Sequence, residues 1–573
     1  MHPHPDRWLL LSAALTAALG PSLLAYNLPP SPTFLNQALA IGLWGLFLAA
    51  AGGQLRDAPL ARSLFAAIAL AALGVAWSWG PGALPASLAL SALGALAAAA
   101  LLAASGAAVR AAPQGRAVFL AFCAGWVAAG AVNAGLAAVQ VFAPGLPDGD
   151  WIARSSLPGR AVGNLRQPNH LSSLLLWASI ALVPLLQAGR LRLRWAAPLL
   201  AALMAAVVLT ASRTGLVSVG LLAAWGAFDR RLAGPTRCLL LAAPLLYALA
   251  WGGMWLWAHA GEHAFGGEAR LAAGDISSSR FGIWADTLAL MRAQPWTGVG
   301  FGEFNLAWSL TPFPGRPTAF FDHTHNLPLQ LLVELGLPLG GAVLGLLLWA
   351  LWQAWRRSAG DAGARAAAMF VVMIGLHSLL EYPLWYAYFL LPAAWAWGYA
   401  LGAAPRAVVD AAPDPGAAER GRPVWAPLAA GLLVIGALWS VADYWRVVRI
   451  FEAPAGAPPL GERIADGRRS LLFGHHADYA AATTGLPQPD GLAVFDRPTH
   501  YLLDTRLMVA WARALHAAGR EDEARQLVQR LREFGPARAE DFFAPCADPA
   551  SAAQAFACQA PQRALDWRAY LAR

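Results

Sequence analysis

Thirteen apolar stretches, most of them close to 20 residues long, recur along the first 442 residues of the chain. They cover residues 8–26, 35–52, 60–79, 84–104, 117–142, 168–188, 195–211, 214–228, 238–258, 326–355, 366–383, 384–402 and 424–442. A helix of about 20 apolar residues spans the hydrocarbon core of a bilayer. Apolar residues make up 58% of the sequence and charged residues only 13%, against about 25% charged residues in soluble domains. This composition excludes a cytosolic enzyme, a disordered chain and a fibrous protein.

Alanine and leucine dominate these stretches, which favours helices over the alternating strands of an outer-membrane barrel. We therefore expect an all-α, polytopic membrane protein with about 12 or 13 transmembrane helices. Two of the divisions between spans rest on few polar residues, namely Ser212-Arg213 and Glu381-Tyr382-Pro383.

Arginine supplies all 41 basic residues, and the formal net charge is +8. If the N-terminus is inside and the spans alternate, the inside loops contain Arg56, Arg62, Arg110, Arg116, Arg190, Arg192, Arg194, Arg230, Arg231, Arg237, Arg356, Arg357, Arg365, Arg406, Arg420 and Arg422. Cytoplasmic loops are enriched in basic residues, so this orientation is favoured and the charge does not indicate nucleic-acid binding. The outside then receives loop 143–167, loop 259–325 and the tail 443–573. We expect a transmembrane domain over 1–442 and a separate tail domain over 443–573 on the outer side of the membrane.

The tail differs in kind from the spans. Apolar residues recur at helical spacing over residues 506–534, and Gly519 interrupts them. This pattern predicts a helical hairpin of the tetratricopeptide (TPR) type. One hairpin cannot bury its own apolar face, so it should pack against neighbouring elements or a partner. It is either a structural cap over the membrane domain or a docking surface for an acceptor. Cys546 and Cys558 could pair if the tail is periplasmic.

Uncommon polar residues gather at the predicted outer ends of the spans. The segment GNLRQPNH, which includes Asn164, enters the sixth span from outside. Pro168 suits the first position of a helix, which places Gln167, Asn169 and His170 at a helix N-terminus. Free N–H groups and the helix dipole make such an end an anion site. Plain capping by asparagine is the alternative.

Two arginines stand on the side where the positive-inside rule does not expect them. Arg213 lies at the outer end of the seventh span, and Arg280 lies in the long outer loop. A guanidinium offers a planar fork of donors that suits phosphate; for Arg213, contact with lipid headgroups is the alternative. Serines before Arg280 should cap a helix whose apolar stripe suits a bilayer surface. The stripe consists of Phe281, Trp284, Leu288 and Met291.

Histidines precede the tenth span in the segment Asp322-His323-Thr324-His325-Asn326. An imidazole titrates near neutral pH, so a general base is the favoured role. Solvated loop histidines and a metal site are the alternatives, and no third well-spaced ligand is apparent.

Span eleven contains ionisable residues, which are functional candidates by default inside a membrane. His377 and Glu381 are four residues apart and would share one helix face. Either they pair to tie helices together, or Glu381 and Tyr382 complete a site at the outer face.

These positions carry a resemblance to a known family. The sequence resembles the bacterial O-linked oligosaccharyltransferases of the PglL type, which belong with the O-antigen ligases and polymerases. The resemblance covers about 160–451. It rests on GNLRQPNHL at 163–171, SRTG at 212–215, SRFGIW at 279–284, PWTGVGFGEF at 295–304, HTHNLPLQLLVELG at 323–336, LHSLLEYPLWYAYFLLP at 376–392 and DYWRVVRIF at 443–451.

The resemblance implies a donor glycan on undecaprenyl pyrophosphate and transfer of the whole glycan to a Ser or Thr hydroxyl of a periplasmic protein such as a pilin. By position, His325 would activate or position the acceptor hydroxyl, and Arg213 and Arg280 would face the pyrophosphate. Glu381 and Tyr382 would complete the catalytic site. Contacts with glycan or acceptor are expected from Asn164, Gln167, Asn169, His170, His323 and Asn326. The other expected partners are membrane lipids. Neither a metal nor another cofactor is expected, and no nucleic acid.

Alternative activities stay open within and outside this superfamily. An O-antigen ligase would transfer the glycan to lipid A-core, and a polymerase would transfer it to a second lipid-linked glycan. The EYPLWY and DYWRVVRIF motifs and the long tail favour a protein acceptor. A lipid or glycan transporter would place ionisable groups near the midplane in related halves, whereas here they favour one face. The sequence does not fix the glycan, the acceptor or the stereochemical outcome.

Overall fold

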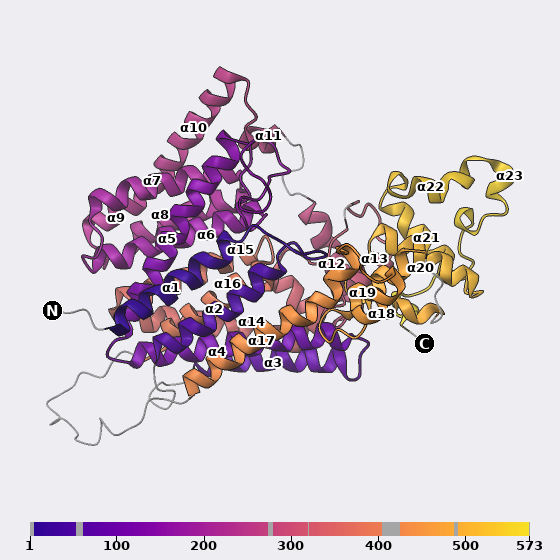
Figure 1. Ribbon diagram of the computed structural model, residues 1–573, viewed down its shortest axis with the longest axis horizontal. Helices are drawn as coiled ribbons and strands as arrows, with labels where there is room; N and C mark the ends of the chain where they lie inside the picture. Colours follow the sequence, from indigo (N-terminus) through magenta and orange to yellow (C-terminus); the bar gives the residue numbers. More distant parts are fainter. Residues whose placement is uncertain are drawn as a thin grey trace. The chain divides into compact units, whose positions relative to one another are not determined.

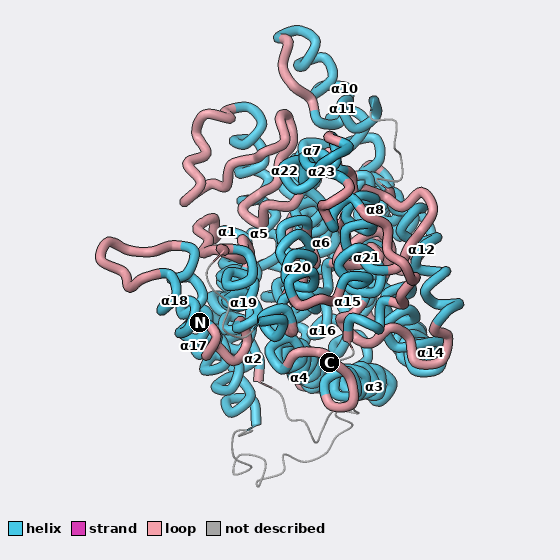
Figure 2. The backbone as a smooth tube through the Cα atoms, turned by 90° about the vertical axis from the view of Figure 1, so that its right-hand side faces the viewer, coloured by secondary structure: helices cyan, strands magenta, loops and turns pink. Residues whose placement is uncertain are grey.

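The computed structural model describes residues 5–52, 61–272, 279–318, 320–403, 425–485 and 491–571. Within these ranges the chain is helical, with short 3-10 turns and no β-strand element (Figure 1, Figure 2). The chain divides into two compact units. Unit 1 comprises Met1–Phe65, Ala97–Ile276 and Leu346–Val441; unit 2 comprises Ala66–Leu96, Ser277–Gly345 and Ala442–Arg573. The predicted domain boundary after residue 442 stays a prediction. Several residues used above lie outside the described ranges: Arg56, Ser277, Ser278, Arg406, Arg420 and Arg422.

Each of the thirteen apolar stretches contains a helix. The first eight are α1 (Pro5–Leu23), α2 (Phe34–Ala51), α3 (Arg62–Trp79), α4 (Ala86–Ala111), α5 (Gly115–Phe142), α6 (Pro168–Gln187), α7 (Leu193–Thr210) and α8 (Arg213–Phe228). The remaining stretches contain α9 (Gly234–Leu241) with α10 (Ala243–Gly261), α14 (Leu327–Arg357), α15 (Ala362–Ser378), α16 (Ala387–Leu401) and α17 (Trp425–Phe451). In the described ranges, nine helices are long and apolar enough to cross a membrane, and α8 and α15 are shorter apolar helices. The prediction of a polytopic helical membrane protein is confirmed.

The division between α7 and α8 is where the sequence placed it. Ala211 adopts a left-handed conformation with φ 49°, which ends α7. The Ser212 hydroxyl then accepts a hydrogen bond from the Gly215 N–H at 3.0 Å, so Ser212 caps α8 and Arg213 becomes its first residue.

The division between α15 and α16 differs from the prediction in one respect. The helix α15 ends at Ser378, before Glu381, and Pro383 opens a 3-10 turn, Pro383–Trp385. Proline lacks an N–H group and disfavours helical geometry at the preceding residue. The prediction that His377 and Glu381 share one face of a membrane helix is therefore wrong: Glu381 lies in the turn that follows the helix.

Small residues allow close helix packing in unit 1. A Cβ added at Gly106 of α4 would overlap the Trp395 carbonyl of α16, and one added at Gly398 would overlap the Ala103 carbonyl. Small residues at helix contacts let backbones approach closely in membrane proteins. The Trp395 ring itself is fully buried and stacks on Phe122 with centroids 4.7 Å apart.

The predicted helical hairpin in the tail is confirmed, whereas its assignment to the TPR type stays a prediction. Helices α20 (Thr505–Ala517) and α21 (Glu521–Glu533) flank Gly519, which has φ 74° (Figure 1). As expected for a single hairpin, it packs on neighbours. After α21, the Phe534 ring stacks on Phe320 at 4.1 Å and lies 5.6 Å from Trp308 of α13 (Phe304–Leu310).

Unit 2 contains a disulfide bond and a break in a long helix. Cys546 and Cys558 form a disulfide, with Cα atoms 5.5 Å apart. The helix α14 is broken at Gly336, which has φ 74° and ψ 167°. The segment 295–300 binds beside this break: the Val299 N–H donates to the Val333 carbonyl at 2.8 Å, and the Leu337 N–H donates to the Pro295 carbonyl at 2.8 Å. Glycine is required at the break, because a Cβ at Gly336 would overlap the Trp296 carbonyl.

Candidate active site

The N-terminus of α6 forms as the sequence predicts, but its cap is a glutamine. Pro168 is the first helical residue, and the Gln167 side-chain oxygen accepts hydrogen bonds from the N–H groups of Asn169 and His170, the latter at 3.1 Å. Because the cap already occupies these two donors, the anion site expected at this helix end is partly filled by the protein itself.

Asn169 connects three of the predicted motifs in unit 1. Its amide Nδ2 donates to Glu381 Oε1 at 3.0 Å, and its Oδ1 accepts from the Ser212 hydroxyl at 2.7 Å. Glu381 and Ser212 are buried, with 7% and 2% exposure. The start of α6, the start of α8 and the turn before α16 are therefore held together by one amide, directly beside Arg213.

Three arginines converge next to this network. Arg213 donates from Nη2 to the Arg270 carbonyl at 2.8 Å, and Arg160 donates from Nε to the Thr210 carbonyl at 3.0 Å. Burial, Arg270 and Arg213 together lower the pKa of Arg160 to about 10. Like charges at short range repel, and the N-terminal end of α8 adds positive potential. This place in unit 1 therefore favours a bound anion.

Two predicted contact residues are enclosed in the protein. Asn164 is 1% exposed, and its amide bonds to the Ala153 N–H and to the carbonyls of Leu23 and Trp151. This bonding favours a structural role over the sugar contact that the sequence suggested. His170 is 3% exposed and places Nδ1 3.0 Å from the Tyr388 hydroxyl.

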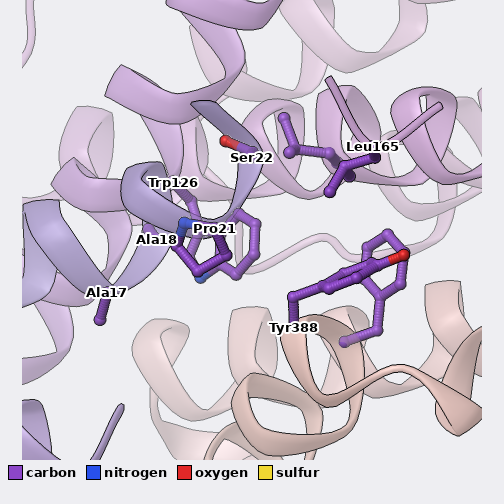
Figure 3. Close-up of a pocket in the computed structure, with 9 residues that line it drawn as sticks. Ala17, Ala18, Pro21, Ser22, Trp126, Leu165 and Tyr388 are labelled. Atoms are coloured by element: carbon purple, nitrogen blue, oxygen red, sulfur yellow. The ribbon is translucent and has the colours of Figure 1, made fainter. Parts of the chain in front are cut away.

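A small cavity lies beside Tyr388, the hydrogen-bond partner of His170, and is too small for a substrate. This cavity of about 10 Å³, lined among others by Trp126, Leu165 and Tyr388, has room for no more than one water (Figure 3). A larger recess of about 350 Å³ lies in loop 143–167, where Arg154, Ser155 and Gly159 are part of its wall. Its volume falls in the range of ligand sites, and Arg160 directly follows its wall in sequence.

Tyr382 remains accessible in unit 1. The side chain is half-buried, and its ring lies 6.2 Å from Tyr386 and 6.5 Å from Trp385. These rings precede α16, beside the buried Glu381. Tyr382 is therefore accessible to a ligand, whereas Glu381 is buried and bonded to Asn169.

In unit 2, Arg280 is half-buried and opens α12 (Arg280–Ala293). Ser279 occupies the cap position with φ 65°, but its side chain makes no capping bond, so the expected serine cap does not form there. Two members of the predicted apolar stripe are exposed, Phe281 at 68% and Leu288 at 40%, and the contact of this stripe with a bilayer stays a prediction.

Residues 322–326, here called the histidine loop, are held tightly by their neighbours. The Thr324 N–H donates to Gln330 Oε1 at 2.8 Å, and the Trp284 indole donates to the Thr324 carbonyl at 3.0 Å. Asn326 caps α14, with its side-chain oxygen 3.0 Å from the Leu329 N–H. His325 adopts a left-handed conformation with φ 54° and is half-buried. Such backbone strain in a non-glycine residue persists where surrounding structure enforces it, often at functional sites.

The other histidine of the loop pairs with its neighbour. His323 Nδ1 lies 3.1 Å from Asp322 Oδ1. Burial raises the pKa of Asp322, but His323 and His325 lower it more strongly, so that the net pKa is about 2. Asp322 is therefore ionised at neutral pH. Among the described residues, no group of three or more His, Cys, Asp or Glu side chains is placed to hold a metal ion.

The predicted site residues fall into two groups. Unit 1 contains Gln167, Asn169, Arg213, Glu381 and Tyr382, of which Asn169 and Glu381 are in direct contact, and unit 2 contains Arg280, His323, His325 and Asn326. Arg160 and Arg270 are not among the site residues predicted from the sequence. Both lie in the predicted outer loops, and an excess of arginine outside the membrane was the signal that could have found them.

Comparisons with known proteins match three regions of the chain. Residues 161–186 match the model of the protein glycosylation ligases, residues 198–344 that of the O-antigen ligases, and residues 366–544 that of the C-terminal part of virulence factor membrane-bound polymerases. The first contains Gln167 and Asn169, the second Arg213 and His325, and the third Glu381.

Two curated relatives come from Acinetobacter baylyi. A general O-oligosaccharyltransferase is 26% identical over 302 residues, which is 50% of each chain. A ComP-specific O-oligosaccharyltransferase is 28% identical over 260 residues, 44% of this chain and 45% of the relative. The chain thus spans about half the length of the curated relatives it matches. These matches confirm the predicted resemblance: the chain is similar to the PglL-type O-oligosaccharyltransferases within the O-antigen ligase superfamily.

Proposed function

We propose that this protein is an O-oligosaccharyltransferase that moves a preassembled glycan from undecaprenyl pyrophosphate to a Ser or Thr hydroxyl of a periplasmic protein such as a pilin. The observation that carries the proposal is the Asn169 amide, which joins three family motifs beside Arg213. The names of the two relatives support the activity.

The arginines are assigned to the pyrophosphate. The resemblance assigns pyrophosphate binding to Arg213 and Arg280. We add Arg160 and Arg270 because both lie close to Arg213. As the glycosyl bond breaks, negative charge develops on the departing pyrophosphate. Fixed guanidinium groups stabilise this charge more than the charge of the bound donor, which lowers the barrier.

His325 is assigned to the acceptor. The acceptor oxygen attacks the anomeric carbon, the bond from that carbon to the pyrophosphate oxygen breaks, and the hydroxyl proton passes to the His325 imidazole. The other candidate residues keep accompanying roles within their own units. In unit 1, Glu381 orients Asn169, the Gln167 side chain caps the start of α6, and Tyr382 offers a half-buried ring. In unit 2, His323 pairs with Asp322. This route needs no metal, so chelators should leave transfer unchanged.

The proposed location is the bacterial inner membrane, with the site and the tail in the periplasm. The disulfide between Cys546 and Cys558 supports this orientation, because disulfides persist in oxidising compartments such as the periplasm. Membrane lipids and the lipid-linked donor are the other partners.

A ligase acting on lipid A-core is the second candidate. The match of residues 198–344 to the O-antigen ligases favours it, and the residues assigned to the donor would be the same in both reactions.

The test is reconstitution in a bacterial host that lacks its own ligase. The cells receive a lipid-linked glycan, a candidate pilin and either the natural chain, His325→Ala or His263→Ala. His263 is an exposed histidine of the same predicted outer loop and serves as the control. The pilin mass and the lipid A are then measured.

A glycan-sized mass on the pilin, lost with His325→Ala and kept with His263→Ala, is the expected result. Glycan on lipid A with unmodified pilin would replace the proposal with the ligase. Transfer that persists in His325→Ala would refute the role of this histidine.

A further inference from the structure

The C-terminal region is bonded directly to the segments that carry the histidine loop. Asn305 of α13 donates from Nδ2 to the Phe321 carbonyl at 2.7 Å and accepts from the Leu503 N–H at 2.8 Å. His500 Nδ1 lies 2.7 Å from a carboxylate oxygen of Glu303. Asn305, Glu303 and His500 are all buried. Residues 500–503 and the start of the histidine loop are therefore held beside the same short helix, and all belong to unit 2.

Tyr501 lies within this bonded segment and stays accessible. Its side chain is 42% exposed, and its ring centroid is 4.5 Å from that of His475 and 4.8 Å from that of His476. Desolvation of its hydroxyl group by the surrounding protein, together with the nearby Asp322, raises the pKa of Tyr501 to about 12. The phenol is therefore neutral at pH 7, and Asp322 of the histidine loop lies within electrostatic reach of it.

The two histidines behind Tyr501 are buried and neutral. Burial lowers the pKa of His476 to about 3, and burial together with His476 and Arg497 lowers that of His475. His475 Nδ1 lies 3.2 Å from the Ser87 hydroxyl. Its other nitrogen, Nε2, is buried and meets no hydrogen-bond partner in the described part of the chain.

We propose that Tyr501, supported by His475 and His476, is a sugar-binding residue that holds the glycan beside the histidine loop. This inference rests on the proposed function and names a further specificity residue for it. Tyr501 would touch the sugar, whereas the two histidines are positioning residues that fix its ring.

The chemistry of this patch fits a carbohydrate better than the other substrates. An aromatic face packs against the C–H face of a sugar ring, and the phenol hydroxyl and the Asp322 carboxylate can bond to sugar hydroxyls. The Asp322 charge disfavours the pyrophosphate. Peptides commonly bind along a free strand edge or in an apolar groove. The patch formed by Tyr501 and Asp322 has neither feature, and offers one exposed ring among polar groups.

The test measures binding and needs no turnover. The purified full chain is titrated with undecaprenyl pyrophosphate, either free of sugar or carrying a trisaccharide, and the two dissociation constants are compared. Tyr501→Ala should weaken binding of the glycan-bearing lipid about 10-fold, because it loses an aromatic contact and a hydrogen bond. Tyr501→Phe keeps the ring and should lose about threefold or less. Neither variant should change the affinity for the sugar-free lipid.

Phe451→Ala is the matched control, since Phe451 is also an aromatic residue of unit 2 and is 40% exposed. It should leave both affinities unchanged. Thermal unfolding checks that each variant is folded.

Equal weakening of both lipids by Tyr501→Ala, or no change in either, overturns the inference. A rise confined to the KM for the acceptor protein overturns it too and assigns Tyr501 to the acceptor. If the natural chain transfers no glycan but the glycan-dependent difference at Tyr501 remains, the proposed function fails while the sugar contact stands.

Discussion

Replacing Asn169 with alanine tests whether the junction of three motifs in unit 1 matters for both stability and activity. The change removes the hydrogen bond to the Glu381 carboxylate at 3.0 Å and the bond from the Ser212 hydroxyl at 2.7 Å. A hydrogen bond to a charged group contributes about 1.5–3 kcal/mol and a neutral one about 0.5–1.5 kcal/mol. Ser212 keeps its bond from the Gly215 N–H, so the second contribution falls at the lower end.

We therefore expect Asn169→Ala to lower the free energy of unfolding by about 2–4 kcal/mol. In a domain of 150–250 residues, 1 kcal/mol shifts the Tm by about 2–4 °C, and by less in a larger one, so the Tm should fall by several degrees. The rate of glycan transfer should fall as well, because Asn169 no longer bonds Glu381 to Ser212 at the start of α8, next to Arg213. A displacement of about 1 Å at a site can cost about 100-fold in rate.

The matched control is Asn133→Ala in the same unit. Asn133 is 0% exposed, and its amide donates to the Ser22 hydroxyl and the Ala129 carbonyl, both at 2.9 Å. This variant should lower the Tm by a similar amount while the folded protein keeps its kcat/KM. Thermal unfolding in detergent and a glycan-transfer assay at a temperature where both variants are folded give the two readouts. Full transfer activity in Asn169→Ala, with a Tm like that of the natural chain, would show that the junction is dispensable.

Three further predictions follow from single contacts. Arg160→Gln should weaken binding of inorganic pyrophosphate about 10-fold. It should not lower the Tm, because it removes a positive charge that the neighbouring arginines repel. Arg190→Gln, at the opposite end of α7, is the control, and titration calorimetry measures the affinity of both variants. Since the folded-state pKa of Asp322 is about 2, below the ordinary 3.8, its stabilising contribution is present above about pH 4 and is lost as the pH falls toward 2; the Tm of Asp322→Asn should depend less on pH in this window, and an identical dependence would contradict the assignment. Cys546→Ser opens a disulfide of sequence separation 12 and should cost roughly 3 kcal/mol; alkylation of Cys558 without prior reduction, seen by mass spectrometry in the natural chain, would show that the pair does not form.

Much of the helical architecture could be predicted because its determinants are local. Apolar length identified each span, Pro168 marked the start of α6, and Ser212 marked the start of α8. The position of Glu381 was not predicted, because helical spacing from His377 suggested one continuous helix, whereas Pro383 ends the helical geometry before it.

The excess of arginine in the predicted outer loops marks Arg160 and Arg270 as candidates, but residue spacing could not predict that they meet Arg213. Arg160, Arg213 and Arg270 are separated by more than 50 residues each, and contacts between distant segments bring them together. Arg270 is bonded to Arg213 through its carbonyl, and the loop that contains Arg160 is bonded to the backbone of α7. The Ala161 N–H donates to the Leu209 carbonyl at 2.8 Å. Such a contact depends on tertiary packing, which residue spacing does not encode. Likewise, the sequence offered Gln167 as a ligand, but the structure uses its side chain as a cap.

The break at Gly336 divides α14 into two parts that can change direction independently. The first part, Leu327–Leu335, starts directly after the histidine loop and is bonded at its far end to residues 299 and 300. The second part, which continues to Arg357, contains the apolar length that a bilayer would surround. Helices respond to changes in bilayer thickness by tilting, and a break absorbs such tilting locally. A tilt of the second part is therefore expected to be absorbed at Gly336, so that the first part holds the histidine loop in place while the second part moves.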